Sequence, residues 1–345
     1  MTKFNARGFA GRLVLAAATF AAAAFAAGAG LAQSLPTLGS VSFPGPSMSA
    51  QPIPIIKGMK LDEKNGWNLE WNVRTTAAAY LNDYYTNVYS GLHVSGVNYL
   101  AANYNKGTPV RIVGGTLVYP YAVMAKADGP VKSMADLKGK SLGSPKASYI
   151  HAYVLALLKN LKLDPDKDLK IENVDILQAA ALLDRGDYDA VVVSAEFAAR
   201  LDSQAPGKFK PIAFPDKDVA KMLGVEEMYL VFTVHADWLK ANPGKVKGLL
   251  ATFAEVQKVV EANPTEAKKL MAPKTEISGG KATGGANIDD FIFKAMYQDG
   301  FHGRKMKWVG IPIKDLKTQL KKEFELYKEI GMIDKIPDDG IFHEE

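Results

Sequence analysis

Short apolar runs alternate along this chain with longer amphipathic stretches. The first pattern predicts strands and the second predicts helices. In the first third of the chain, the predicted strands are Leu38 to Phe43, Trp67 to Val73, Val88 to Leu92, Pro109 to Leu117 and Tyr121 to Lys126. The helices predicted between them are Ile53 to Asn65, Ala77 to Leu81 and Val97 to Tyr104. Strands that alternate with helices are typical of an α/β fold.

The segment from Val131 to Val193 continues this order. A short strand leads into a Gly/Ser/Pro/Ser loop that ends at Ser148, and a helix then runs to Leu161. A second helix ends at Gly186, before an apolar strand. We expect this order to build an open α/β lobe with a polar helix N-terminus at its rim, where a small molecule is held.

The remainder of the chain continues with strands and then mainly helices. Strands are predicted at Phe209 to Phe214 and Met228 to His235, and the second of these returns the chain to the first lobe. Helices are predicted at Pro243 to Ala262, Thr265 to Met271, Asn287 to Tyr297 and Ile313 to Ile330. Residues 274 to 288 are rich in Gly, Ser and Thr and predict a loop.

Residues 1–32 have the pattern of a secretory signal peptide. Lys3, Arg7 and Arg12 form a basic start, Leu13 to Ala27 is apolar, and Gly30 to Ala32 offers small residues for cleavage. The alternative is a membrane anchor, but the apolar run is short and Ala-rich for a bilayer that needs about 20 apolar residues. We therefore expect a soluble protein in the periplasm.

Charge and cysteine content exclude several classes of partner and site. The signal carries three of the 42 Lys and Arg residues and none of the 37 acidic residues, so its removal lowers the net charge from +5 to +2. This balance gives no support for a nucleic-acid partner. The chain has no cysteine, which excludes a lipid-anchoring cysteine, a thiol nucleophile and a thiolate metal site.

Small polar residues follow several predicted strands at the starts of helices. They are Ser47, Thr75 (or Thr76), Ser95, and the loop from Ser144 to Ser148. Ligands of open α/β sheets lie at such positions, so together these residues predict a ligand cleft. The alternative for each one is an ordinary helix N-cap.

Four further side chains are candidates for ligand contact. Arg74 directly follows a strand and suits a carboxylate or sulfonate, with a surface ion pair as its alternative. Tyr149 begins the helix after Ser148, and its alternative is packing on the lobe surface. His93 lies beside Ser95, and the histidines show no metal-like spacing, so we expect no metal. Many tyrosines precede residue 122, which suits a ring-bearing ligand, although packing is the alternative for each.

An ordered set of motifs resembles one family of binding proteins. Ser133 to Gly143 resembles the entry to the second lobe in solute-binding proteins of ABC importers, in the SsuA-like group that also takes in thiamine-precursor-binding proteins. This group covers nitrate, sulfonate and taurine receptors. The other matching segments are Gly58 to Trp67, Leu163 to Pro165, Leu183 to Ala190, Ala241 to Pro243, Ala262 to Ala267 and Tyr327 to Pro337.

The resemblance implies a type II periplasmic-binding-protein fold with two α/β lobes joined by two crossing strands. The crossings would lie near Tyr121 to Ala127 and Glu227 to Val234. Residues 33–125 and 228–345 would then form lobe one, and residues 126–227 would form lobe two. The implied function is capture of a small organic anion, sulfonate or carboxylate, by hinge closure and its delivery to an ABC permease at the inner membrane. We expect a monomer that is not an enzyme and has no cofactor.

One departure from the family pattern concerns the ligand. After the strand that ends at Val193, the family often has an aromatic residue followed by proline, whereas this chain has Ser194-Ala195-Glu196. A carboxylate there either repels an anion or accepts a hydrogen bond from an amine or hydroxyl of the ligand. The alternative function is pyrimidine or thiamine-precursor binding, or synthesis, on the same fold.

Overall fold

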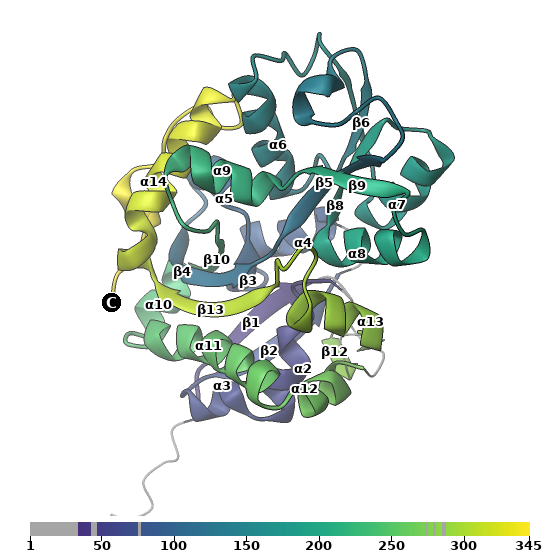
Figure 1. Cartoon of the computed structure of the whole chain (residues 1–345). Coiled ribbons are helices and arrows are strands. Elements are labelled where there is room, and N and C mark those ends of the chain that lie inside the picture. Colours follow the sequence, from purple (N-terminus) through teal and green to yellow (C-terminus); the bar gives the residue numbers. More distant parts are fainter. Residues whose placement is uncertain (1–33, 43–46, 75–76, 273–274, 279–280, 285–287) are drawn as a thin grey trace, which may run out of the picture. The chain divides into compact units, whose positions relative to one another are not determined.

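The computed structural model describes residues 34–42, 47–74, 77–272, 275–278, 281–284 and 288–345. Residues Thr37–Glu345 form one compact unit, which contains two sheets (Figure 1). The predicted signal peptide and Thr75 lie outside the described residues. The alternation of strands and helices confirms the predicted α/β fold class, with two α/β lobes.

The larger sheet has the strand order β11-β12-β2-β1-β3-β10-β4-β13. β1 pairs in parallel with β2 and β3, whereas β10 is antiparallel to β3 and β4. Its strands are β1 (Thr37–Ser42), β2 (Asn68–Val73), β3 (Gly91–Ser95), β4 (Val110–Val118), β10 (Leu230–His235), β11 (Thr275–Ser278), β12 (Lys281–Gly284) and β13 (Lys307–Pro312).

The smaller sheet has the order β7-β6-β8-β5-β9. β6 is parallel to β7 and β8, and β5 is antiparallel to β8 and β9. Its strands are β5 (Tyr121–Lys126), β6 (Ser141–Ser144), β7 (Lys170–Asn173), β8 (Ala190–Ser194) and β9 (Phe209–Ala213). β8 is buried along its whole length because helices cover both of its faces, which explains its continuous apolar run.

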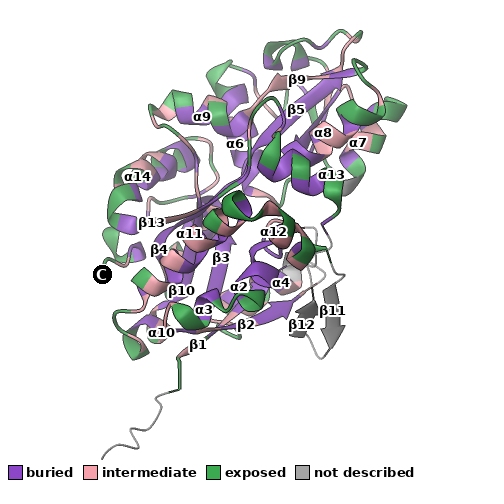
Figure 2. Cartoon of the chain, turned by 60° about the horizontal axis from the view of Figure 1, so that its bottom comes forward, coloured by how far each residue is buried: buried purple, intermediate pink, exposed green. Residues whose placement is uncertain are grey.

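Helices cover both sheets. They are α2 (Pro52–Gly58), α3 (Leu61–Lys64), α4 (Ala77–Tyr85), α5 (Val97–Asn105), α6 (Tyr149–Asn160), α7 (Ile176–Arg185), α8 (Ala195–Gln204), α9 (Pro215–Leu223), α10 (Ala236–Ala241), α11 (Val246–Ala262), α12 (Pro264–Met271), α13 (Asp290–Phe293) and α14 (Ile313–Glu329). Figure 2 shows β3, β10 and most of β5 buried, with exposed residues on the outer faces of the helices. The last helix, α14, packs on α5 and β4 and also reaches α9 (Figure 1).

The chain passes between the two sheets twice. It leaves β4 through Tyr119 and Pro120 and enters the smaller sheet at β5. It returns from α9 into β10, which lies between β3 and β4. These two crossings run close to each other, because the start of β10 pairs with the end of β4, with Leu230 opposite Leu117.

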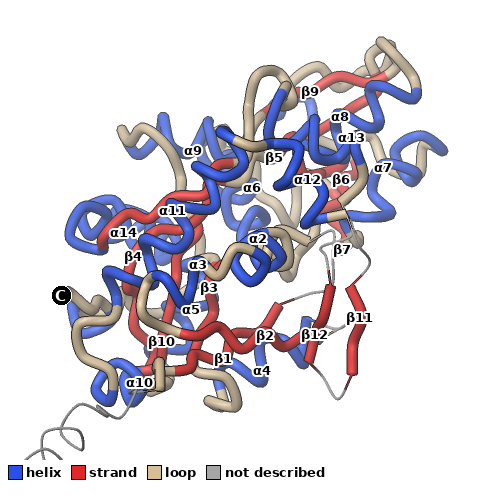
Figure 3. Tube along the Cα trace, turned by 90° about the horizontal axis from the view of Figure 1, so that it is seen from below, coloured by secondary structure: helices blue, strands red, loops and turns tan. Residues whose placement is uncertain are grey.

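The prediction of a loop at residues 274 to 288 is wrong. This segment contains β11 and β12, an antiparallel pair in which Thr275 lies opposite Gly284. β12 then joins β2 next to Asn72 (Figure 3). The Gly-rich composition signals a turn, but pairing with a strand 200 residues earlier in the chain is a long-range contact that local composition does not encode.

Other boundaries also differ from the prediction. The strand expected at Val88 to Leu92 begins at Gly91, because Val88 is exposed and α4 extends to Tyr85. The single helix expected from Ile53 to Asn65 is broken at Lys60, whose φ of 52° is left-handed. β13 was not predicted, since its short apolar run contains Gly310 and Pro312 and lies at a sheet edge.

Candidate ligand-binding cavity

A cavity of about 580 Å³ lies at the ends of strands from both sheets. In the larger sheet it is lined by the residues that follow β1 and β3, and by one face of α4. In the smaller sheet it is lined by the residues that follow β6, β7 and β8. These strands run parallel within each sheet, so their carboxyl ends meet at one edge, where α/β proteins bind ligands.

Five of the predicted site residues line this cavity, namely Ser47, Ser95, Ser148, Tyr149 and Glu196. Ser148 is the N-cap of α6, but its hydroxyl makes no capping hydrogen bond. Ser194, directly before α8, also lines the cavity. Thus Ser47, Ser95 and Ser148 come together at one cavity, whereas Ser144 is not part of its described lining. Their role in binding stays a prediction.

Arg74 is not among the described residues that line the cavity. Its Nε donates to Asp83 at 2.6 Å, and Nη2 donates to the hydroxyl of Tyr89 at 3.0 Å. The guanidinium also lies over the Tyr89 ring, 5.4 Å from its centre. The ion pair considered as the alternative therefore accounts for this side chain, and we leave Arg74 out of the proposed ligand contacts.

His93 lies behind the cavity lining, buried in β3. Its Nε2 is 2.7 Å from the backbone oxygen of Ser49, so this nitrogen donates, and Nδ1 then accepts from the hydroxyl of Ser40 at 2.8 Å. Burial lowers the pKa of His93 to about 4, and the ring stacks on Phe253. The neutral imidazole therefore holds Ser49, which does line the cavity.

Ser144 is also behind the lining. Its hydroxyl is 2.9 Å from Nδ1 of His151, on the first turn of α6. Burial, with the charge of Lys146, lowers the pKa of His151 to about 4. Ser144 and His151 thus connect the end of β6 to α6 and position the loop between them.

Glu196 lies in the first turn of α8, with 4% of its surface exposed. Its Oε1 accepts two hydrogen bonds, from Tyr119 at 2.5 Å and from Ser194 at 2.6 Å. Its Oε2 is buried and has no partner among the described residues. Burial raises the pKa of this carboxyl, although the hydroxyl donors and Arg200 lower it.

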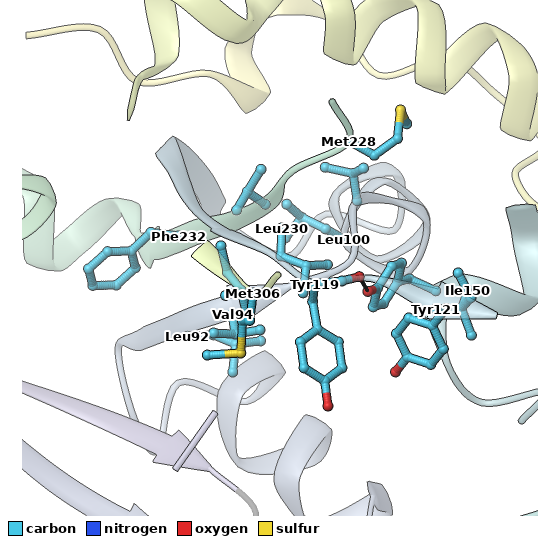
Figure 4. Packing of buried hydrophobic residues seen from close by; sticks show 14 of the residues in the cluster. Leu92, Val94, Leu100, Tyr119, Tyr121, Ile150, Met228, Leu230, Phe232 and Met306 are labelled. Carbon is cyan, nitrogen blue, oxygen red and sulfur yellow. Dashed lines mark hydrogen bonds between the residues drawn. The ribbon is translucent and has the colours of Figure 1, made fainter. Parts of the chain in front are cut away.

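Tyrosines form much of the wall. The six that line the cavity are Tyr80, Tyr85, Tyr99, Tyr119, Tyr121 and Tyr149. Tyr121 makes edge-to-face contacts with Tyr119 and with Tyr149, at 5.3 and 5.8 Å between ring centres. Figure 4 shows Tyr119 and Tyr121 side by side at the crossing, next to the apolar residue Leu230. The density of tyrosines before residue 122 was the sequence signal for this wall.

Two lining residues, Asn173 and Asp175, were missed by the sequence prediction. Asn173 ends β7 and Asp175 follows it; β7 is a strand of four residues whose short polar sequence gave no strand pattern. Asp175 and Glu196 are the charged residues among the described lining, which contains no Lys, Arg or His. In the part of the chain that the structure describes, no group of three or more His, Asp or Glu residues is arranged to hold a metal ion.

Comparison with known proteins places these features in a family. A family model described as NMT1/THI5 like matches residues 87–267. No curated protein sequence matches the chain. Among described residues, no helix has the length and apolar character needed to cross a bilayer.

Several solved structures share the fold. The periplasmic aliphatic sulphonate binding protein SsuA from Escherichia coli is 16% identical to this chain, with a TM-score of 0.65. The alignment covers 88% of this chain and 89% of the SsuA chain. The alkanesulfonate-binding protein SsuA from Xanthomonas axonopodis pv. citri, bound to MOPS, is 15% identical with a TM-score of 0.65, covering 90% and 98%. The desulfurization enzyme DszB is 15% identical with a TM-score of 0.60, covering 90% and 97%. The likeness confirms the predicted periplasmic-binding-protein fold.

Proposed function

The chain belongs to the NMT1/THI5-like family, as its ordered motifs predicted, and from this premise we propose that it is the extracytoplasmic solute-binding receptor of an ABC importer. The solute binds in the cavity between the two sheets. The two lobes close over it by bending at the crossings, and the closed form delivers the solute to a permease at the inner membrane.

The observation that carries this proposal is the position of the cavity. Its wall includes Ser95 from the larger sheet, Ser148 from the smaller sheet, and Tyr119 at the crossing between them. A rotation about the crossings therefore changes the distance between opposite walls. A ligand that contacts both walls stabilises the closed form, because it binds that form more tightly than the open one.

The proposed lobes follow the two sheets. We assign residues 33–125 and 228–345 to lobe one and residues 126–227 to lobe two. β10 begins at Leu230, close to the second limit, whereas β5 (Tyr121–Lys126) belongs to the smaller sheet although residues 121–125 are assigned to lobe one. The predicted signal at residues 1–32 supports export to the periplasm, where we propose that the protein works as a monomer.

The ligand is a small organic solute. The names of the SsuA proteins favour a sulfonate, and the N-termini of α5 and α6 at the cavity supply backbone N–H groups that suit an anion. The described lining, however, contains carboxylates and no cationic side chain. The cavity wall therefore favours recognition by aromatic rings and hydroxyl groups over recognition by a fixed positive charge.

The test is a thermal-shift screen of the purified protein against sulfonates, aromatic carboxylates, amines, alcohols, nitrate and pyrimidines. A receptor shows saturable stabilisation by its ligand and leaves it chemically unchanged, as mass spectrometry of the recovered ligand will show. We expect Tyr149→Ala to abolish most of the shift. Tyr188→Ala is the matched control, because Tyr188 bonds Glu172 at 2.7 Å and is not in the described lining.

If the protein consumes the ligand that stabilises it, the protein is an enzyme and the receptor function is wrong. This second function is kept in the test because the desulfurization enzyme DszB has a similar fold. A pyrimidine that is bound and converted would likewise support synthesis rather than transport. If Tyr149→Ala keeps the full ligand-induced thermal shift, the cavity is not the binding site.

A further inference from the structure

The free carboxylate oxygen of Glu196 is an unused acceptor in the cavity wall. Oε1 of this residue already receives the hydroxyl groups of Tyr119 and Ser194, whereas Oε2 has no partner among the described residues. Glu196 is 96% buried, yet it lines the cavity. A buried carboxylate oxygen without a partner is costly, so the ligand is the natural source of its donor.

Two features around Glu196 favour its ionised form, although burial raises the pKa of this carboxyl. Two hydroxyl donors on Oε1 stabilise negative charge on the carboxylate. Glu196 also lies in the first turn of α8, where the helix dipole favours an acid. The carboxylate therefore interacts with the partial positive charge at the N-terminus of α8, so this N-terminus is not available to an anionic ligand.

The charge of Arg200 lowers the pKa of Glu196, but among the described residues no cation donates a hydrogen bond to this carboxylate. Arg200, one turn farther along α8, donates to Asp289 at 2.6 Å and lies over the ring of Phe291. The side chain of Lys146 is exposed, and Lys146 is not part of the described lining. No side chain of the described wall therefore supplies the positive charge that Glu196 lacks.

The rings around Glu196 complete a site for a cation. The hydroxyl of Tyr119 bonds the carboxylate, and Tyr121, Tyr149 and Phe197 line the same cavity. The faces of aromatic rings attract cations within about 6 Å, and this attraction grows when the cation is desolvated. An aromatic wall with one buried carboxylate is the arrangement that recognises an organic ammonium ion.

We propose that the solute is an organic ammonium ion, a protonated amine on a ring or a short apolar body, and that Glu196 selects it through Oε2. The inference rests on the proposed receptor function and deepens it. A sulfonate would place like charge beside an unpaired carboxylate oxygen, which is unfavourable in a buried site. A neutral alcohol would satisfy the hydrogen bond but leave the buried carboxylate without a counter-charge, which is costly in a site shielded from water.

The experiment compares ligands that differ in charge on the same body. Benzyl, phenethyl and butyl compounds are each tested as the ammonium, the alcohol and the sulfonate, by calorimetric titration of the purified full chain. We expect at least one ammonium to bind about tenfold or more tightly than its alcohol, and the sulfonate to bind weakest, because only the ammonium carries a charge opposite to that of the carboxylate.

Two variants isolate the role of Glu196. Glu196→Gln keeps the shape and removes the charge, so we expect ammonium affinity to fall about tenfold or more while alcohol affinity changes less than about twofold. Glu323→Gln is the matched control, because Glu323 is also a buried carboxylate that accepts from tyrosines but is not in the described lining. It should leave the ammonium affinity unchanged.

The outcomes separate this inference from the receptor function. If the sulfonates or alcohols bind best, or if Glu196→Gln keeps full ammonium affinity, the ligand class is overturned and the receptor function stands. If no compound of the series binds but the wider screen finds a saturable ligand without an amine, the ligand class is likewise overturned. If Glu196→Gln does not fold, the series on the unaltered protein decides the question by itself.

Discussion

At the residue scale, polar groups near the cavity divide into those that face it and those that hold its wall. His93 and Ser144 follow the pattern of ligand contacts in the sequence, yet both point into the protein. The reason is that β3 and the end of β6 are buried on both faces, so the alternation of side chains along a strand does not identify an open face. Their hydrogen bonds fix the backbone that does line the cavity.

Substitution of His93 tests this supporting role. His93→Leu leaves the backbone oxygen of Ser49 and the hydroxyl of Ser40 without this partner in a buried site. We expect a loss of about 1–3 kcal/mol in the free energy of unfolding, measured with urea. His343→Leu, at a partly exposed position near the C-terminus, should change stability by less than about 0.5 kcal/mol. If His93→Leu is as stable as the unaltered protein, the hydrogen bonds of His93 do not support the cavity wall.

Gly96 marks where the two lobes touch at the cavity. A Cβ at this position would lie 2.3 Å from the Cβ of Tyr149, which belongs to the opposite wall. We expect Gly96→Ala to cost about 1–3 kcal/mol of stability and to weaken ligand binding, because the walls cannot approach as closely. The control is Gly129→Ala, where the added Cβ would lie 3.3 Å from Lys126, a milder contact outside the described cavity lining. Ligand affinity equal to that of the unaltered protein would show that this contact is absent when the ligand is bound.

At the element scale, α6 and α14 meet through a buried carboxylate. Tyr153 of α6 donates to Oε2 of Glu323 at 3.2 Å, and Tyr327 of α14 donates to the same oxygen at 3.0 Å. Gln319 donates to Oε1 at 3.3 Å. Burial raises the pKa of Glu323 from its usual 4.5 to about 7. The network thus links a helix of each lobe through an acid that prefers to stay protonated.

This pKa predicts how stability changes with pH. Between about pH 4.5 and 7 the unfolded chain releases the proton of Glu323 while the folded chain keeps it, so this group makes the protein less stable as pH rises. His93 and His151 act in the opposite direction below pH 6.5, because burial keeps them neutral. The comparison with Glu323→Gln isolates the carboxyl. Relative to this variant, we expect the unaltered protein to lose stability in urea unfolding as pH rises from 4.5 to 7.

A difference in stability between the unaltered protein and Glu323→Gln that stays constant from pH 4.5 to 8 would contradict this account of Glu323.

Elements also show where the local sequence pattern stops being informative. The long amphipathic helices α11 and α14 follow their predicted ranges closely, because their period of 3.6 residues extends over several turns. β7 and β13 were missed, since strands of four to six residues with polar, Gly or Pro positions take their structure from their neighbours.

At the scale of the whole molecule, one ion pair joins segments around the crossings. Arg304 donates to Asp216, in the first turn of α9, and also to the backbone oxygen of Tyr121 at 3.3 Å. The backbone N–H of Tyr121 donates to Asp216 at 3.1 Å. Burial raises the pKa of Asp216 although Arg304 lowers it, so the carboxylate depends on this partner. The pair therefore fixes the start of β5 relative to α9 and the C-terminal part of the chain.

Removal of Arg304 should destabilise the unit strongly. Arg304→Met leaves Asp216 buried without its counter-charge, and we expect a loss of about 3–5 kcal/mol in urea unfolding. The double variant Arg304→Met/Asp216→Asn removes both charges and should recover most of this loss. If the double variant is as unstable as the single one, packing of Arg304 on Phe214 rather than charge pairing accounts for its contribution.

The sequence by itself determined the strand and helix order, the α/β class, and the serines at strand ends, because each of these follows from local periodicity and from residues a few positions apart. The tertiary structure decided which candidates meet. Glu196 receives Tyr119 because β5 pairs with β8 so that Tyr121 lies opposite Ser194, a register formed between segments about 70 residues apart. Arg74 directly follows β2 and His93 lies within β3, but ion pairing of the first and burial of the second on both strand faces turned them away from the cavity. Such choices depend on long-range packing, which no local pattern encodes.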